Sequence, residues 1–238
     1  LRKYSKHGIV PGSLRKQVWP YLLNVDVKSI NYVPKTIQDP KEQDQVARDV
    51  ERSLWKLVPD EVQRAKKRLA LSRMINTVLV NHPELHYFQG FHDVAAVFLL
   101  VCGERLGYAL LERVSLNHLF DHHDETMKPI IAQLDLLLPL IAKVDPEVYA
   151  FLSKSEVNAY FALPWVLTWF SHVVDDLESI SRLYDYFLAT HPLMSLYLSA
   201  AIVVFRKKEL MQVSCNYAQV LHFLNRLPPL EDSLEHLI

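Results

Sequence analysis

Apolar residues recur at intervals of three and four along almost the whole of this chain, and few segments alternate with the period of two that a strand requires. Val46, Val50 and Leu54, for example, are each four residues apart. This spacing places apolar side chains on one face of a helix, so we expect an all-α fold. No fixed repeat and no Ser/Gly-rich linker divides the sequence, and we therefore expect one irregular multi-helix domain over residues 1–238.

Capping residues, prolines and glycines divide this pattern into helices. Ser13 is expected to cap a first helix that Pro20 kinks or ends. Asp60 is expected to cap another, and Asp145-Pro146 supplies both a cap and a proline at the first helical position. The longest loop is predicted over residues 26–39. The later helices are predicted at residues 40–57, 60–80, 89–106, 108–120, 126–143, 146–153, 157–173, 177–189, 193–210, 217–226 and 231–237.

Composition excludes several classes of protein. The 26 Lys and Arg residues nearly balance the 27 Asp and Glu residues, which removes the overall basic field typical of nucleic-acid binding. Two cysteines cannot form a disulfide framework. The five glycines form no Gly-rich phosphate-binding loop. The longest apolar runs, residues 94–102 and 193–205, are shorter than the ~20 residues of a spanning helix and are expected to be buried helices.

A histidine-acid cluster is the first candidate for chemistry, and it consists of His118, Asp121, His122, His123 and Asp124. On a helix, His118 and His122 would share a face, as two metal ligands must. The pairs formed by histidine and a following aspartate, at 92–93 and 123–124, also resemble those of helical metal-dependent phosphohydrolases. The favoured interpretation is a solvated turn after a helix, and a metal-dependent HD-type phosphohydrolase is the alternative.

Two further patterns are each ordinary when taken alone. In Val46-x-x-Asp49-x-x-Arg52, the acid and the arginine are neighbours on a helix, so the carboxylate can hold the guanidinium in one direction. The segment Tyr87-Phe88-Gln89-Gly90 lies where a loop turns into the most apolar predicted helix. It places an amide at a helix N-terminus, and Gly90 lets another backbone approach closely.

Taken together, these patterns resemble the TBC domain, the helical module that activates Rab GTPases. Three motifs carry the resemblance in the family's order: Gly8-Ile9-Val10-Pro11 with Arg15, Trp19 and Leu22-Leu23, then Val46-x-x-Asp49-x-x-Arg52, then Tyr87-Phe88-Gln89-Gly90. Further landmarks are Leu163-Pro164-Trp165, Trp169-Phe170 and Arg182-Leu183-Tyr184-Asp185. The stretches HYFQGFHDV, LTWF and RLYDYFLATHPLM resemble the ER-anchored branch, which acts on the Rab of ER-to-Golgi traffic.

The resemblance implies a fold with N-terminal and C-terminal helical lobes and a GTPase-activating function. Arg52 would neutralise the charge that develops during phosphoryl transfer, and Gln89 would orient the attacking water, both in trans. Asp49 would aim Arg52. Other supporting residues would be Tyr87, Gly90, His92 and Asp93, with Arg15 and Trp19 packing the first helix near the site.

Two departures from the family pattern lie beside these residues. His92 stands where many members have Asn, which is expected to change the hydrogen bonding behind Gln89. Ser53-Leu54-Trp55 follows Arg52 where T-F-P is common.

On this interpretation the chain is not itself an enzyme and holds no metal or cofactor, because GTP and Mg²⁺ are bound by the partner. The expected partner is a Rab GTPase in its GTP form, with no nucleic acid. We expect action at the cytoplasmic face of ER or Golgi membranes, with membrane contact only through segments outside this chain. A catalytically silent scaffold that only binds a small GTPase is a second alternative.

Overall fold

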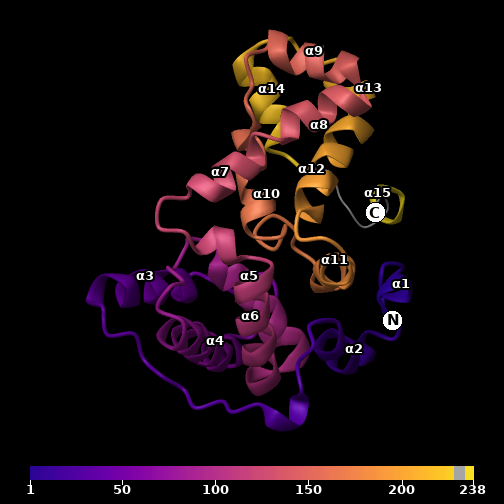
Figure 1. Ribbon diagram of the computed structural model, residues 1–238. Coiled ribbons are helices and arrows are strands. Elements are labelled where there is room, and N and C mark those ends of the chain that lie inside the picture. Colours follow the sequence, from indigo (N-terminus) through magenta and orange to yellow (C-terminus); the bar gives the residue numbers. More distant parts are fainter. Residues whose placement is uncertain (228–233) are drawn as a thin grey trace.

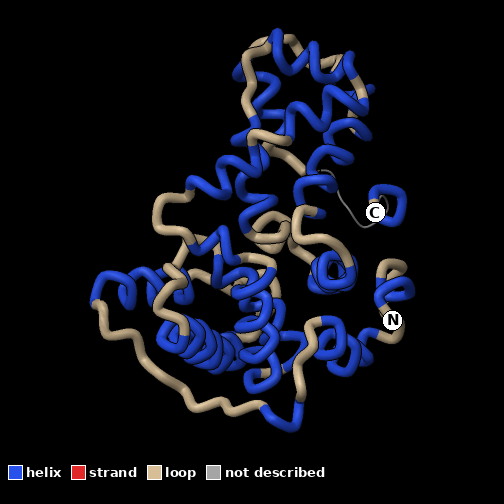
Figure 2. Tube along the Cα trace, viewed as in Figure 1, coloured by secondary structure: helices blue, strands red, loops and turns tan. Residues whose placement is uncertain are grey.

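The computed structural model describes residues 1–227 and 234–238, and in these residues it contains helices and loops but no strand. The all-α prediction is therefore confirmed. Figure 1 shows two groups of helices, one formed mainly by the first half of the chain and one by the second half. Figure 2 shows the loops that connect them, including the long segment between α2 and α3.

The first lobe is built around α5, whose apolar residues lie on nearly every side. Phe91, Val94 and Phe98 are completely buried. The α5 helix packs against α4 and α6, and α3 packs against α4 (Figure 1). The elements of this lobe are α1 (Arg2–Ser5), η1 (Gly12–Leu14), α2 (Arg15–Leu22), η2 (Val27–Ser29), α3 (Pro40–Glu51), α4 (Glu61–Asn81), α5 (Phe91–Cys102) and α6 (Glu104–Asn117), where η marks a 3₁₀ turn.

The second lobe packs α8 against α9 and α12, and α10 against α12. Its α11 helix also contacts α1, α2 and α5, so it joins the two lobes. The second-lobe elements are η3 (Phe120–His123), α7 (Lys128–Leu134), α8 (Leu137–Val144), α9 (Pro146–Lys154), η4 (Ala159–Ala162), α10 (Leu163–Leu167), α11 (Leu177–Ala189), α12 (Met194–Phe205), α13 (Lys207–Leu210), α14 (Tyr217–Leu224) and α15 (Leu234–Leu237).

Several predicted helix ends are wrong because local signals were stronger than the apolar period. The helix expected over 40–57 ends at Glu51, and Leu54 then takes a positive φ of 65°. The helix expected over 89–106 begins at Phe91 and ends at Cys102, because Gly103 adopts a φ of 83° that starts a new helix. The helix expected over 108–120 is α6, which begins already at Glu104 and ends at Asn117.

Long predicted helices in the second half are divided in the same way. Residues 126–143 form α7 and α8, and residues 193–210 form α12 and α13. Residues 157–173 form only η4 and the short α10, because Pro164 starts a new helix and Trp169 and Phe170 both take positive φ. Of the predicted helix 231–237, only α15 lies within the described residues.

The capping predictions had mixed outcomes. Asp60 accepts a hydrogen bond from the backbone N–H of Gln63, and Asp145 accepts from those of Glu147 and Val148, as predicted. Ser13, however, lies inside η1 and caps nothing. Pro20 does not end α2, which continues to Leu22.

No helix in the described part of the chain combines the length and the apolar character needed to cross a bilayer.

Candidate functional site

Arg52 lies at the position where α3 ends. Its backbone N–H donates to the carbonyl of Arg48, and its side chain extends into solvent with 62% of its surface exposed. The Nη2 group donates to Oδ1 of Asp49, three residues earlier. The predicted contact between these two side chains is therefore present, although Arg52 follows the helix rather than lying within it.

Asp49 is buried, and its carboxylate accepts the hydrogen bond from Arg52. Its second carboxylate oxygen accepts a hydrogen bond from the hydroxyl of Tyr87 at 2.9 Å. Burial and the neighbouring carboxylate raise the pKa of Tyr87, so this phenol stays protonated and remains a donor. One carboxylate oxygen accepts from Tyr87 and the other from Arg52, so a buried and hydrogen-bonded group fixes the direction of the guanidinium.

A chain of polar side chains continues from Tyr87 to the surface. The Tyr87 hydroxyl lies 3.2 Å from Nδ1 of His92, and Nε2 of His92 lies 3.3 Å from Oδ1 of Asp93. Oδ2 of Asp93 accepts from Nδ1 of His172 at 2.8 Å. Burial lowers the pKa of His92, whereas the hydrogen bond to Asp93 raises the pKa of His172. This series of polar contacts thus connects Asp49 in the first lobe to His172 in the second.

Gln89 is exposed, while Phe88 before it and Gly90 after it are buried. No hydrogen bond joins its amide to another side chain or backbone group within residues 1–227 and 234–238, so the amide is available to another molecule. Gln89 precedes α5 instead of starting it, because Gly90 is the N-cap, with a φ of 104°. A Cβ at Gly90 would lie 2.6 Å from Cγ2 of Thr168, so the close approach is made by a side chain of the second lobe and not by another backbone, as was predicted.

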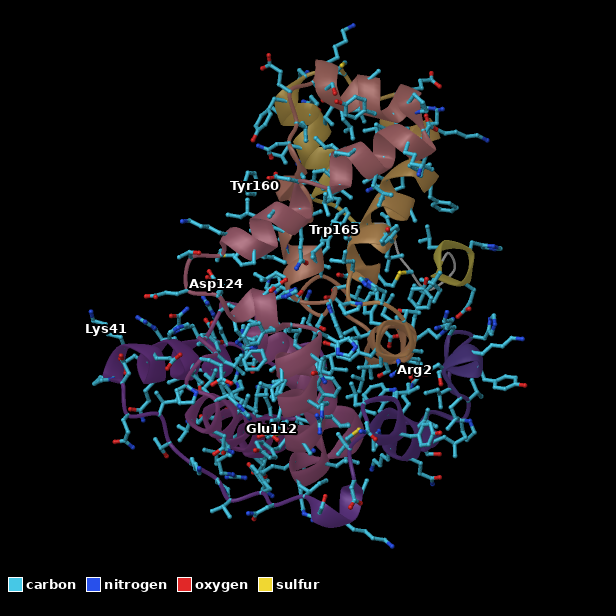
Figure 3. The ribbon with its side chains drawn as sticks, in the orientation of Figure 1. Arg2, Lys41, Glu112, Asp124, Tyr160 and Trp165 are labelled. Carbon is cyan, nitrogen blue, oxygen red and sulfur yellow. The ribbon has the colours of Figure 1, made fainter. Side chains whose placement is uncertain are left out.

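Arg52 and Gln89 line the same cleft between the two lobes, which has a volume of about 1030 Å³. Tyr87, Gly90, His92 and Asp93 also line it. The remaining lining residues are Asp39, Lys41, Glu42, Gln45, His86, Phe88, Asp124, Glu125, Met127, Leu163, Pro164, Leu167, Thr168 and His172. Two of them, Lys41 and Asp124, are labelled in Figure 3. The structure therefore brings together an exposed cation and an exposed amide on one open surface.

Arg15 and Trp19 were also predicted to support the site, but they do not line this cleft. Both side chains are buried on α2 and bind Asp185 of α11, the arginine through Nε and Nη2 and the indole through Nε1 at 2.7 Å. Arg15 also donates to Glu178 at 2.7 and 2.8 Å. These two residues join α2 to α11 and thus hold the lobes together.

The histidine-acid cluster lies in the turn after α6, as the favoured interpretation predicts, and its two acids, Asp121 and Asp124, are exposed. That interpretation is wrong for two of its histidines, which are enclosed and not solvated. The α6 helix ends at Asn117, so His118 and His122 do not share a helix face. In the described residues, no group of three or more His, Cys, Asp or Glu side chains could hold a metal ion. His122 and His123 are buried, and burial lowers the pKa of each to about 4.

The motifs did not identify several residues that shape the site. Glu42 accepts the backbone N–H of Tyr87 at 2.9 Å, Thr168 packs on Gly90, and His172 binds Asp93. Glu42 stands three residues after the N-cap Asp39, a spacing typical of a capping box, and this signal would have predicted a contact with its own helix instead. Thr168 and His172 lie far from the motifs in sequence, so the contacts are visible only in three dimensions.

A helical domain that exposes an arginine and a glutamine in one open cleft is suited to acting on a group bound to another macromolecule. Similarity to known protein families defines the class further. A family model described as the Rab-GTPase-TBC domain matches residues 12–211. The chain belongs to this family of Rab GTPase-activating domains.

Individual relatives agree with this assignment. The chain is 42% identical over 228 residues to human "TBC1 domain family member 20", covering 94% of this chain and 57% of the relative. It is 32% identical over 228 residues to "GTPase-activating protein gyp10" of Schizosaccharomyces pombe, covering 93% and 61%. The chain thus spans only about three fifths of these relatives. The crystal structure of the Ypt/Rab-GAP domain of Gyp1p has the same fold, with a TM-score of 0.82 at 17% identity and coverage of 99% and 88%.

Proposed function

We propose that this chain accelerates GTP hydrolysis by a Rab GTPase, and that Arg52 and Gln89 both enter the partner's nucleotide site. One observation carries the proposal: Arg52 and Gln89 line the same cleft. The guanidinium of Arg52 is held by the buried carboxylate of Asp49, whereas the amide of Gln89 is unengaged. Family membership supports a GTPase as the partner. The name of the S. pombe relative describes it as a GTPase-activating protein.

Arg52 would act on charge. In phosphoryl transfer, negative charge develops on the transferred group and on the leaving oxygen, and a guanidinium stabilises it by two hydrogen bonds at once. Asp49 engages only Nη2, so other N–H groups of Arg52 remain for the nucleotide. An arginine supplied in trans is worth roughly 10³–10⁵-fold in rate, or about 4–7 kcal/mol of transition-state stabilisation.

Gln89 would act on the attacking water. A glutamine side chain both donates and accepts, so it can hold the water and a phosphate oxygen together. Its position between the buried Phe88 and Gly90 restricts the backbone while leaving the amide exposed. The two side chains thus have different tasks, one electrostatic and one orienting.

The nucleotide and Mg²⁺ would come with the partner in its GTP form, and the chain would transform no substrate of its own. We also propose that it acts at the cytoplasmic face of ER or Golgi membranes, through segments outside this chain. This location rests on the stretches quoted above that resemble the ER-anchored branch, and on the similarity to TBC1 domain family member 20.

A multiple-turnover hydrolysis assay against a panel of GTP-loaded Rab proteins tests the proposal. We expect acceleration of at least one Rab, and loss of that acceleration in Arg52→Ala and in Gln89→Ala, with circular dichroism unchanged. A silent scaffold would bind the Rab without changing its rate. Full activity in either variant would overturn the roles given to these two residues.

A further inference from the structure

The 3₁₀ turn η3 contacts the segment that carries Gln89, and it does so through two hydrogen bonds to one residue. The backbone N–H of His86 donates to the carbonyl of His123 at 3.1 Å. Nδ1 of the His123 ring lies 2.8 Å from the carbonyl oxygen of His86. His86 lies three residues before Gln89, and both polar groups of its backbone are therefore held by His123.

The His123 ring also contacts the chain on both sides of Gln89. It packs edge-to-face against Phe88, with ring centroids 5.0 Å apart, and against Phe91 at 4.6 Å. Its side chain is enclosed, with only 1% of the residue exposed. The contacts of this one ring thus extend from His86 to Phe91, and Gln89 lies near the middle of that span.

The chemistry fixes the form of the ring. A carbonyl oxygen can only accept, so Nδ1 must carry the proton. Nε2 is buried and has no hydrogen-bond partner in the described residues, and burial lowers the pKa of the ring. The ring is therefore neutral and protonated at Nδ1, and a single N–H group provides its polar contact with the Gln89 segment.

The other contacts on this segment come from different directions. Glu42 of α3 binds the backbone N–H of Tyr87, and Thr168 presses on Gly90 from the second lobe. Removing the contact at His86 would leave the first residues of the segment free to shift, although the helix that follows Gly90 would stay in place.

We infer that His123 is a positioning residue for Gln89. It fixes the backbone from which the amide projects, although it touches neither the amide nor the cleft. This inference rests on the proposed function of Gln89. It assigns a role to part of the histidine-acid cluster that the metal interpretation could not explain.

The test uses two variants that differ in where they place an N–H group. The amide nitrogen of Asn can take the place of Nδ1, whereas that of Gln reaches further, toward the place of Nε2. We therefore expect His123→Asn to keep the bond to His86 and His123→Gln to lose it. His118→Leu is the control, because His118 is a half-buried histidine just before η3 that packs on Trp169 instead.

Two quantities are measured with a responsive Rab: the single-turnover hydrolysis rate at saturating activator, and the affinity for the Rab loaded with a non-hydrolysable GTP analogue. A displacement of about 1 Å in a positioned group costs on the order of 10²-fold in rate. We expect His123→Gln to lower the saturating rate by roughly 10–100-fold and to leave the affinity within about threefold. His123→Asn and His118→Leu should stay within a few-fold of the parent rate. All variants are compared at a temperature where circular dichroism shows them folded.

Gln89→Ala separates this inference from the proposed function. If Gln89→Ala keeps the full saturating rate, the proposed role of Gln89 fails. If Gln89→Ala is slow but His123→Gln is not, only the role of His123 is wrong. Equal losses in His123→Asn and His123→Gln would show that packing, not the hydrogen bond, matters. In the double variant we expect no loss beyond that of Gln89→Ala, since His123 acts only through that side chain.

Discussion

Two arginine–aspartate pairs in this molecule have the same chemistry and opposite surroundings. In the pair between α2 and α11, the side chains of Arg15 and Asp185 are 4% and 0% exposed. In the pair at the end of α3, Asp49 is 3% exposed but Arg52 is 62% exposed. Both carboxylates are buried, so the difference lies in the guanidinium alone. The enclosed arginine joins two parts of the protein, whereas the exposed one is accessible to another molecule.

The hydrogen bonds of each guanidinium explain this difference. Arg15 uses Nε, Nη1 and Nη2 on Asp185 and Glu178, and Asp185 also accepts from Trp19 and from the backbone of Ile9. The guanidinium of Arg52 donates through Nη2 to Asp49 and makes no other hydrogen bond to the described residues. The first arginine is fully engaged within the fold, and the second keeps donors for a ligand.

The largest expected effect is the loss of rate in Arg52→Ala. We expect the acceleration of GTP hydrolysis to fall by roughly 10³–10⁵-fold, while the free energy of unfolding changes by about 1 kcal/mol or less, as for an exposed ion pair. Single-turnover assays and urea titrations measure the two quantities. Arg48→Ala, an exposed arginine on the same helix and outside the cleft, should change neither. A stability loss as large as the rate loss would remove the distinction between the two pairs.

Arg15→Ala should show the reverse pattern. Removing one partner of a buried ion pair leaves an uncompensated charge and costs about 3–5 kcal/mol, so urea should unfold this variant far more easily. The hydrolysis rate per folded molecule should stay within a few-fold, because Arg15 lies outside the cleft. Lys16→Ala, its exposed neighbour, is the matched control. Unchanged stability in Arg15→Ala would mean that the lobes are held together in some other way.

These two pairs also show what the sequence can predict. The pair Asp49 and Arg52 is local, separated by three residues, and its contact was predicted correctly from spacing. The partner of Arg15 lies 170 residues away, and no local pattern indicates that pairing. Arg15 and Trp19 were therefore predicted near the site, whereas they connect the lobes.

The same division between local and distant contacts holds for the fold. The all-α class follows from the apolar period, which repeats in nearly every segment. Helix ends were less accurate, because residues such as Gly103 and Pro164 end or start helices inside apolar stretches. The burial of His122 and His123 could not be predicted, since it depends on packing against Phe88, Phe91 and α10.

Gly90→Ala tests how Gln89 is positioned. This second exposed side chain is held by the geometry of the neighbouring backbone and not by a carboxylate. Its φ of 104° and the 2.6 Å approach to Thr168 both oppose a Cβ. We expect a stability loss of about 1–3 kcal/mol, typical of a strained residue, and a lower hydrolysis rate. Adding Thr168→Ser removes Cγ2 but keeps the hydroxyl that binds Pro164, so it should recover part of the loss. No recovery would show that the φ angle alone is responsible.

The smallest effect concerns His172 and Asp93, a third pair, in which the cation is exposed and the carboxylate is only partly buried. The hydrogen bond to Asp93 raises the pKa of His172, so the folded state favours its protonated form. This contribution is complete below the unfolded pKa of about 6.5 and is lost as the pH rises through the higher pKa of the folded state. Because the His172 side chain is 61% exposed, we expect His172→Ala to cost less than about 1 kcal/mol.

Urea titrations at pH 5.5 and pH 8.5 should show the larger cost at the lower pH. An equal cost at both values would mean that the charge on His172 contributes nothing. A larger cost at high pH would contradict the pairing itself. In either case, pairing with a partly buried carboxylate would not be sufficient to make an exposed cation contribute to stability.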